Sequence, residues 1–179
     1  MGGLERIETE RLVLRRPVAA DASAVFARYS SDPEVTRFMS WPRHRSIEDC
    51  SMFLQFSDTQ WERGVGPYLI EARDGGRLLG GTGLGFETPQ RAATGYVLAR
   101  DAWGQGYATE ALRAVVDVAA RAGVRRLYAL THTEHSASWH VLEKCAFVRE
   151  GILRSHTEFP NLSPGELSDV LSYARVLKS

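Results

Sequence analysis

The sequence predicts one mixed α/β domain, in which about four helices pack on a mostly antiparallel sheet of about seven strands. Short apolar runs bounded by turn residues indicate strands, and Asp74-Gly75-Gly76 between two of them is typical of a hairpin. From residue 107 onward, helical and strand patterns alternate, which predicts a parallel strand pair within that sheet. The chain of 179 residues has the size of one domain, and we expect residues 1–179 to form it.

The first half is predicted to place two helices between strands. Asp21 can cap a helix that ends before Asp32. Ser46, with Asp49 three residues later, forms a weak capping box for a helix that runs towards Arg63. The strands expected here are residues 12–15, 68–72, 78–86 and about 92–98.

The second half is predicted to alternate helices and strands. A helix that Gly123 ends carries small and apolar side chains on one face, at Ala108, Ala111, Leu112, Val115, Ala119 and Ala122. A second helix is expected over 136–146, and strands over 127–133, 147–155 and 168–176.

Composition argues against several partners. Lysine plus arginine equals aspartate plus glutamate, at 22 each, so we expect no nucleic-acid or membrane partner. No apolar run could span a membrane and the first residues do not form a signal peptide, so we expect a cytoplasmic protein. Cys50 and Cys145 are too few and too far apart for a disulfide framework or a zinc site, and the five histidines show no metal-ligand spacing. We therefore expect no metal.

The segment Trp103 to Thr109 has two glycines where a helix begins. Free N–H groups at a helix start attract phosphate, and glycine lets a phosphate approach them. The residues after Gly106 are not those of a P-loop, and Thr109 stands where a dinucleotide fingerprint needs Gly or Ala. Chemistry alone leaves phosphate binding and a structural turn as equal alternatives. The glycines within 80–85 lie inside a strand and indicate backbone crowding or a bulge.

Gly95-Tyr96-Val97-Leu98, followed by residues 103–111, resembles the acetyl-CoA signature of the GCN5-related N-acetyltransferases (GNAT). Residues 9–15 and 135–151 resemble the opening strand and late helix of the branch typified by the ribosomal-protein N-terminal (RimJ/RimL-like) acetyltransferases. The resemblance covers nearly the whole chain and implies a GNAT-like fold with a splayed sheet. It also implies transfer of acetyl from acetyl-CoA to a primary amine, by direct attack in a ternary complex. Alternatives are a CoA-binding or acyl-CoA-binding protein with lapsed catalysis, and an acyltransferase for another acyl group or acceptor. A monomer and a homodimer both fit.

The resemblance also implies which residues hold the cosubstrate. Pyrophosphate would lie on the loop formed by Trp103, Gly104, Gln105, Gly106, Tyr107, Ala108 and Thr109. Pantetheine would bond to strand backbone at Val97, Leu98 and Ala99. His135 stands where the branch usually has an Asn that meets the pantetheine arm. Leu142 replaces the tyrosine acid of many members, so Ser138 is the predicted acid that reprotonates the thiolate, the alternative being a serine that satisfies helix backbone.

Departures from the family pattern leave the base and the acceptor open. Asp101, at the first position of the phosphate motif, is expected to weaken CoA affinity. Thr94 replaces a frequent glutamate, and the remaining base candidates are His132, Glu87, Glu134 and Glu166. Histidine as a residue type can accept a proton near neutral pH, so His132 is the predicted catalytic base, the alternatives being a packed strand histidine and a water chain.

The acceptor pocket is expected between the first two helices. Phe38 and Trp41 are predicted to line it, although core packing is an equal alternative. Ribosomal N-termini, other peptides, aminoglycosides, amino acids and polyamines all remain possible acceptors.

Overall fold

A computed structural model describes residues 4–62 and 64–177 and shows an eight-stranded sheet in the order β1-β2-β3-β4-β5-β6-β8-β7. All neighbouring strands are antiparallel except β5 and β6. The strands are β1 (Arg6–Glu8), β2 (Leu12–Arg15), β3 (Pro67–Ala72), β4 (Leu78–Thr88), β5 (Arg91–Leu98), β6 (Arg126–His132), β7 (Val148–Glu158) and β8 (Leu167–Val176). The predicted fold class is confirmed, with a parallel pair where alternation of helices and strands begins.

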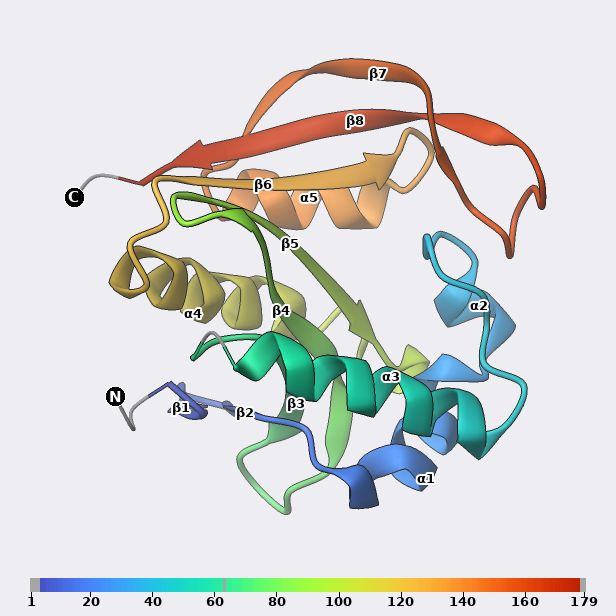
Figure 1. Cartoon of the computed structure of the whole chain (residues 1–179), viewed down its shortest axis with the longest axis vertical. Coiled ribbons are helices and arrows are strands. Elements are labelled where there is room, and N and C mark those ends of the chain that lie inside the picture. Colours follow the sequence, from blue (N-terminus) through green and yellow to red (C-terminus); the bar gives the residue numbers. More distant parts are fainter. Residues whose placement is uncertain (1–3, 63, 178–179) are drawn as a thin grey trace.

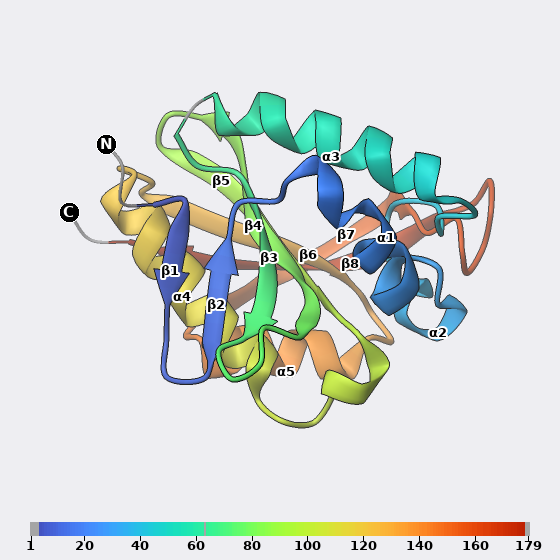
Figure 2. The same cartoon turned by 90° about the horizontal axis from the view of Figure 1, so that it is seen from below.

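Helices cover both faces of this sheet (Figures 1 and 2). They are α1 (Ala22–Val25), α2 (Pro33–Thr36), α3 (Ile47–Trp61), α4 (Tyr107–Arg121) and α5 (Ser136–Lys144). Successive residues of a strand point to opposite faces, so β3 contributes to two cores. Ile70 packs with residues of α4, and Leu69 packs with residues of α1 and α3. Among the described residues, no helix has both the length and the apolarity needed to cross a membrane.

Two elements add to the sequence expectations, namely the short edge strand β1 and the one-turn helix α2. The last strand, β8, lies between β6 and β7, a strand order that the sequence does not predict. The predicted end of the second helix, Arg63, lies outside the described residues.

The predicted capping role of Asp21 is wrong for its side chain: Asp21 stands at the N-cap position of α1, but its carboxylate makes no bond to that helix. The carboxylate accepts hydrogen bonds from the Arg15 guanidinium at 2.7 and 2.8 Å and, in the capping box of the preceding 3-10 helix (Ala19–Asp21), from the Val18 amide at 2.7 Å. Burial opposes ionisation of Asp21, but the bonds from Arg15 and Val18 and the arginine charge outweigh it and lower its pKa. The ion pair therefore ties β2 to the start of α1, which sequence patterning had attributed to a cap.

Backbone crowding explains the glycine cluster of β4. A Cβ on Gly80 would lie 2.0 Å from the Val97 carbonyl oxygen, and one on Gly83 would lie 2.6 Å from the Pro67 Cα. These distances allow no side chain, which confirms the crowding interpretation. The two cysteines, Cys50 and Cys145, are buried free thiols, as expected.

Candidate active site

The parallel pair β5 and β6 separates after three residue pairs, the last of which is Ala93 with Tyr128. β5 nevertheless stays paired with β4 as far as Leu98. The Trp103 indole N–H donates to the Leu98 carbonyl at 2.8 Å, so that carbonyl faces away from β4. Backbone groups alternate in direction along an antiparallel ladder, so Tyr96 presents its N–H and C=O to the same open edge. The sheet is therefore splayed, and one edge of β5 is left without a strand partner.

A cleft of about 930 Å³ opens at this gap. Its lining includes five of the predicted site residues, namely Val97, His135, Ser138, Phe38 and Trp41. It does not include Leu98 or Ala99, whose side chains are buried at the end of β5, nor His132, nor the predicted pyrophosphate loop 103–109. The structure thus brings the predicted thiolate acid, two of the predicted pantetheine contacts and the acceptor residues to one cavity.

The glycine loop leads directly from the end of β5 into α4. Gly104 and Gly106 have φ angles of +73° and +79°, a conformation that side chains with a Cβ rarely adopt. Gly106 is the N-cap of α4 and caps it with no side chain, so the N–H groups of Tyr107, Ala108 and Thr109 have no acceptor within the helix. A Cβ built on Gly104 would meet no atom within 4 Å, so the loop surface is open there. Unpaired donors beside an open surface fit an anionic group.

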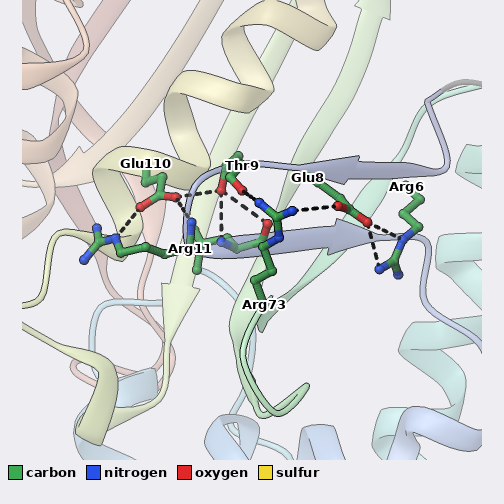
Figure 3. A network of polar contacts seen from close by, with 7 residues as sticks. Arg6, Glu8, Thr9, Arg11, Arg73 and Glu110 are labelled. Carbon is green, nitrogen blue, oxygen red and sulfur yellow. Dashed lines mark hydrogen bonds and ion pairs between the residues drawn. The ribbon is translucent and has the colours of Figure 1, made fainter.

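The turn between β1 and β2 holds this loop in place (Figure 3). Arg11 donates from Nη1 to the Gln105 carbonyl at 2.9 Å and from Nε to Glu110 at 2.8 Å, and its guanidinium lies 4.7 Å above the Tyr107 ring. Glu110 in turn accepts from the Arg11 amide at 2.8 Å and from the Thr9 hydroxyl at 2.6 Å. Burial by itself would raise the pKa of Glu110. The hydrogen bonds from Thr9 and Arg11 and the Arg11 charge have the larger combined effect, so the pKa is lowered below its usual range.

Sequence reasoning missed this clamp. The run from Thr9 to Arg15 was assigned only to an opening strand, and no local pattern shows that it meets a glutamate about 100 residues later. The spacing in the sequence is too long for any periodicity to detect.

Ser138 lies beside the hydroxyl of Tyr96. That hydroxyl donates to the Ser138 carbonyl at 2.6 Å and is 3.2 Å from the Ser138 Oγ. Burial raises the pKa of Tyr96, so the phenol stays protonated. A protonated phenol and a serine hydroxyl together form a short chain of O–H groups at the cleft. The Tyr96 hydroxyl was not singled out from the sequence, although the residue belongs to the quoted motif.

Comparison with known proteins identifies the family. A family model described as an acetyltransferase (GNAT) domain matches residues 11–148. This chain belongs to the GNAT family of acetyltransferases. An uncharacterized N-acetyltransferase, YoaA of Bacillus subtilis, is 36% identical over 154 residues, covering 84% of this chain and 86% of the relative. Another, p20 of Bacillus licheniformis, is 29% identical and covers 96% of both chains.

Solved GNAT structures share the fold. The ribosomal L7/L12 α-N-protein acetyltransferase RimL, in complex with coenzyme A, has a TM-score of 0.84 at 24% identity and covers 97% of this chain and 98% of its own. The microcin C7 self-immunity acetyltransferase MccE, in complex with acetyl-CoA and AMP, has a TM-score of 0.84 at 18% identity and covers 94% of each chain. The family model confirms the predicted GNAT superfamily, and these solved structures show the same fold, while the RimJ/RimL-like branch stays a prediction. With relatives named N-acetyltransferases, the chain is an N-acetyltransferase by family.

Asp101, which departs from the usual residue of the GNAT phosphate motif, is paired with two arginines. Its carboxylate accepts from Arg28 at 2.8 and 3.1 Å and from Arg77 at 3.0 Å. The hydrogen bond from Arg28, followed by the charges of both arginines, lowers the pKa of Asp101. The Gln105 side chain donates to the Asp101 carbonyl at 2.7 Å, which braces the loop from inside. The expected loss of CoA affinity stays a prediction. It concerns a carboxylate whose charge two guanidinium groups neutralise.

His132 is packed between two aromatic rings. His132 is 8% exposed and lies between Phe38 and Phe159, at centroid distances of 5.1 and 4.9 Å. Its Nδ1 accepts from the Glu134 amide at 3.2 Å, which leaves the hydrogen of the neutral ring on Nε2. Proton acceptance at Nδ1 would require that bond to break. The catalytic role of His132 stays a prediction.

His135 and the carboxylate candidates are placed differently. The His135 ring stacks on Phe38 at 4.7 Å inside the cleft, and burial, followed by the nearby His132, lowers its pKa. The structure does not bring Glu87, Glu134 or Glu166 to the described lining of the cleft. Glu87 instead pairs with Arg91 and accepts from the hydroxyl of Tyr128, a residue that does line the cleft.

Proposed function

We propose that the protein is an acetyl-CoA-dependent N-acetyltransferase that acetylates a primary amine by direct attack in a ternary complex. One observation carries the proposal: the unpaired edge of β5 borders the cleft, and one short 3-10 helix (Arg100–Ala102) further along the chain a glycine loop opens α4. A long ligand with an amide-rich arm and an anionic end would match this sequence of features. The similarity to RimL and MccE, which are described in complex with CoA and acetyl-CoA, supports the same ligand.

The chain has backbone groups for the pyrophosphate and for the pantetheine arm of acetyl-CoA. The loop from Trp103 to Thr109 would bind the pyrophosphate through its amides, with the positive end of the α4 dipole behind them. The open edge of β5, through the N–H and C=O of Tyr96 and the N–H of Leu98, would bond to the pantetheine arm as an added strand would, with Val97 and Ala99 beside it. His135 lines the same cleft and would contact the arm. Acetyl-CoA itself supplies the acetyl group as a thioester.

The reaction then depends on positioning and on proton transfer. A backbone N–H of β5 would polarise the thioester carbonyl while the amine nitrogen attacks its carbon, so that a C–N bond forms and the C–S bond breaks. Ser138, supported by Tyr96, would return a proton to the thiolate, whose ordinary pKa is about 8.5. The amine must lose a proton before attack, and His132 remains the predicted base.

Thiol release from acetyl-CoA in the presence of amine acceptors, together with calorimetric binding of acetyl-CoA, tests the proposal. We expect wild-type protein to bind acetyl-CoA and to release thiol with an acceptor. Ser138→Ala should lower kcat by about 10²-fold, the lower range for a general acid, with little change in acetyl-CoA affinity. Binding without release across a broad acceptor panel would favour lapsed catalysis, and absence of binding would contradict the proposal.

A further inference from the structure

The acceptor side of the cleft is apolar and aromatic. Beyond the β5 edge its walls include Phe38, Trp41, Met52, Phe53, Phe56 and Phe159. Met52 and Phe56 lie one turn apart on α3 and are 62% and 59% exposed. Large apolar side chains that line a cleft and remain open to water are covered when a ligand with an apolar body binds.

The same wall offers little negative charge to a further cation. Of the described residues that line the cleft, Asp49 is the only carboxylate, and its Oδ2 accepts from the Arg45 amide at 2.8 Å and the Ser46 amide at 3.2 Å. A second ammonium group of the acceptor, placed anywhere but beside Asp49, would lie against apolar walls without an ion-pair partner, which is costly.

We infer that the acceptor is a primary amine attached to an apolar body that carries no second positive charge. The inference rests on the proposed acetyl transfer and narrows its acceptor class. Polyamines and aminoglycosides, which the sequence alone left open, carry several ammonium groups and fit this wall poorly. The favoured chemistry can come from a small alkyl or aryl amine or from a peptide that begins with a large apolar residue.

Matched acceptors test the inference. The first pair is hexylamine and hexamethylenediamine, which differ by one ammonium group. The second pair is a tripeptide that begins with phenylalanine and one that begins with lysine. We compare kcat/KM within each pair. Preference for the singly charged member of each pair, by at least about tenfold, is expected. The alkyl and peptide pairs together identify the source of the amine. Equal or faster turnover of hexamethylenediamine or kanamycin would overturn the inference.

A charge added to the wall provides a second test. Phe56→Asp should shift the ratio of kcat/KM towards hexamethylenediamine by about threefold or more, whereas the neutral control Phe56→Asn should not. Phe56 is largely exposed, so both variants are expected to fold, and thermal unfolding checks this. Equal ratios in the two variants would overturn the inference.

Acetyl-CoA binding, measured by calorimetry without acceptor, distinguishes a failure of the acceptor inference from a failure of the proposed acetyl transfer. Loss of acetyl-CoA binding in the wild-type protein would contradict the proposed function. Intact binding, with turnover of hexamethylenediamine or kanamycin but of no apolar monoamine or apolar peptide, would overturn the acceptor inference alone.

Discussion

Removing the carboxylate of Glu110 should loosen the loop that we assign to pyrophosphate. Glu110 accepts three hydrogen bonds, one from Thr9 and two from Arg11, and Arg11 holds the Gln105 carbonyl in the loop. A hydrogen bond to a charged group contributes about 1.5–3 kcal/mol when well shielded. The Arg11 side chain is 44% exposed, so solvent screening reduces its share. We expect Glu110→Ala to lower the free energy of unfolding by roughly 1–2 kcal/mol in total.

The same substitution should weaken acetyl-CoA binding. If half of that stabilisation comes from ordering the loop, Kd rises about two- to fivefold, since about 1.4 kcal/mol corresponds to tenfold. Calorimetry measures Kd, and urea unfolding measures stability. Arg6→Ala is the control, because Arg6 belongs to the same network in Figure 3 but pairs only with exposed Glu8. Loss of stability with an unchanged Kd would refute the reasoning, since the clamp would then support the fold and not the loop.

Three further predictions concern stability. Ala146→Gly should raise the free energy of unfolding by about 0.5–1 kcal/mol, because Ala146 ends α5 with a φ of +60°; a loss of stability on urea unfolding would contradict this. Gly80→Ala should lower the free energy of unfolding by more than about 3 kcal/mol, because the added methyl group would collide with the Val97 carbonyl oxygen. Gly85→Ala should change it little, since no atom lies within 4 Å of the added group. Equal shifts of the unfolding temperature in the two variants would contradict the crowding interpretation. The pKa of Asp21 is lowered by folding, so its contribution is complete above its unfolded pKa of about 3.9 and disappears as pH falls through the folded value. Acid unfolding of Asp21→Asn should therefore converge with wild type at low pH, and a constant difference would contradict the assignment.

Local patterns were sufficient for most elements of the fold. The hairpin at Asp74, the helix that Gly123 ends and the parallel pair all follow from spacing within a few residues. β1, at three residues, is too short for an alternation pattern, and the position of β8 between β6 and β7 depends on packing. Asp21 was misassigned because a carboxylate before a helix is also free to pair with an arginine from another strand, here Arg15.

The site likewise has a part that local sequence predicts and a part that depends on long-range contacts. The loop around Gly104 and Gly106 was visible in sequence because its backbone requirement selects glycine. The pairing of Ser138 with Tyr96 joins residues 42 apart, and the bond from Thr9 to Glu110 joins residues 101 apart. Such contacts depend on how strands and helices meet, and no periodicity within one segment encodes them.

The most direct test of the account is the affinity of acetyl-CoA for two glycine variants of α4. Gly106→Ala and Gly123→Ala place the same methyl group at φ angles of +79° and +82°, at opposite ends of one helix, so both introduce similar strain. We predict that Gly106→Ala raises Kd by about tenfold or more, a change of about 1.4 kcal/mol, while Gly123→Ala leaves Kd near the wild-type value. Equal affinities in the two variants would contradict the claim that the start of α4 binds the pyrophosphate.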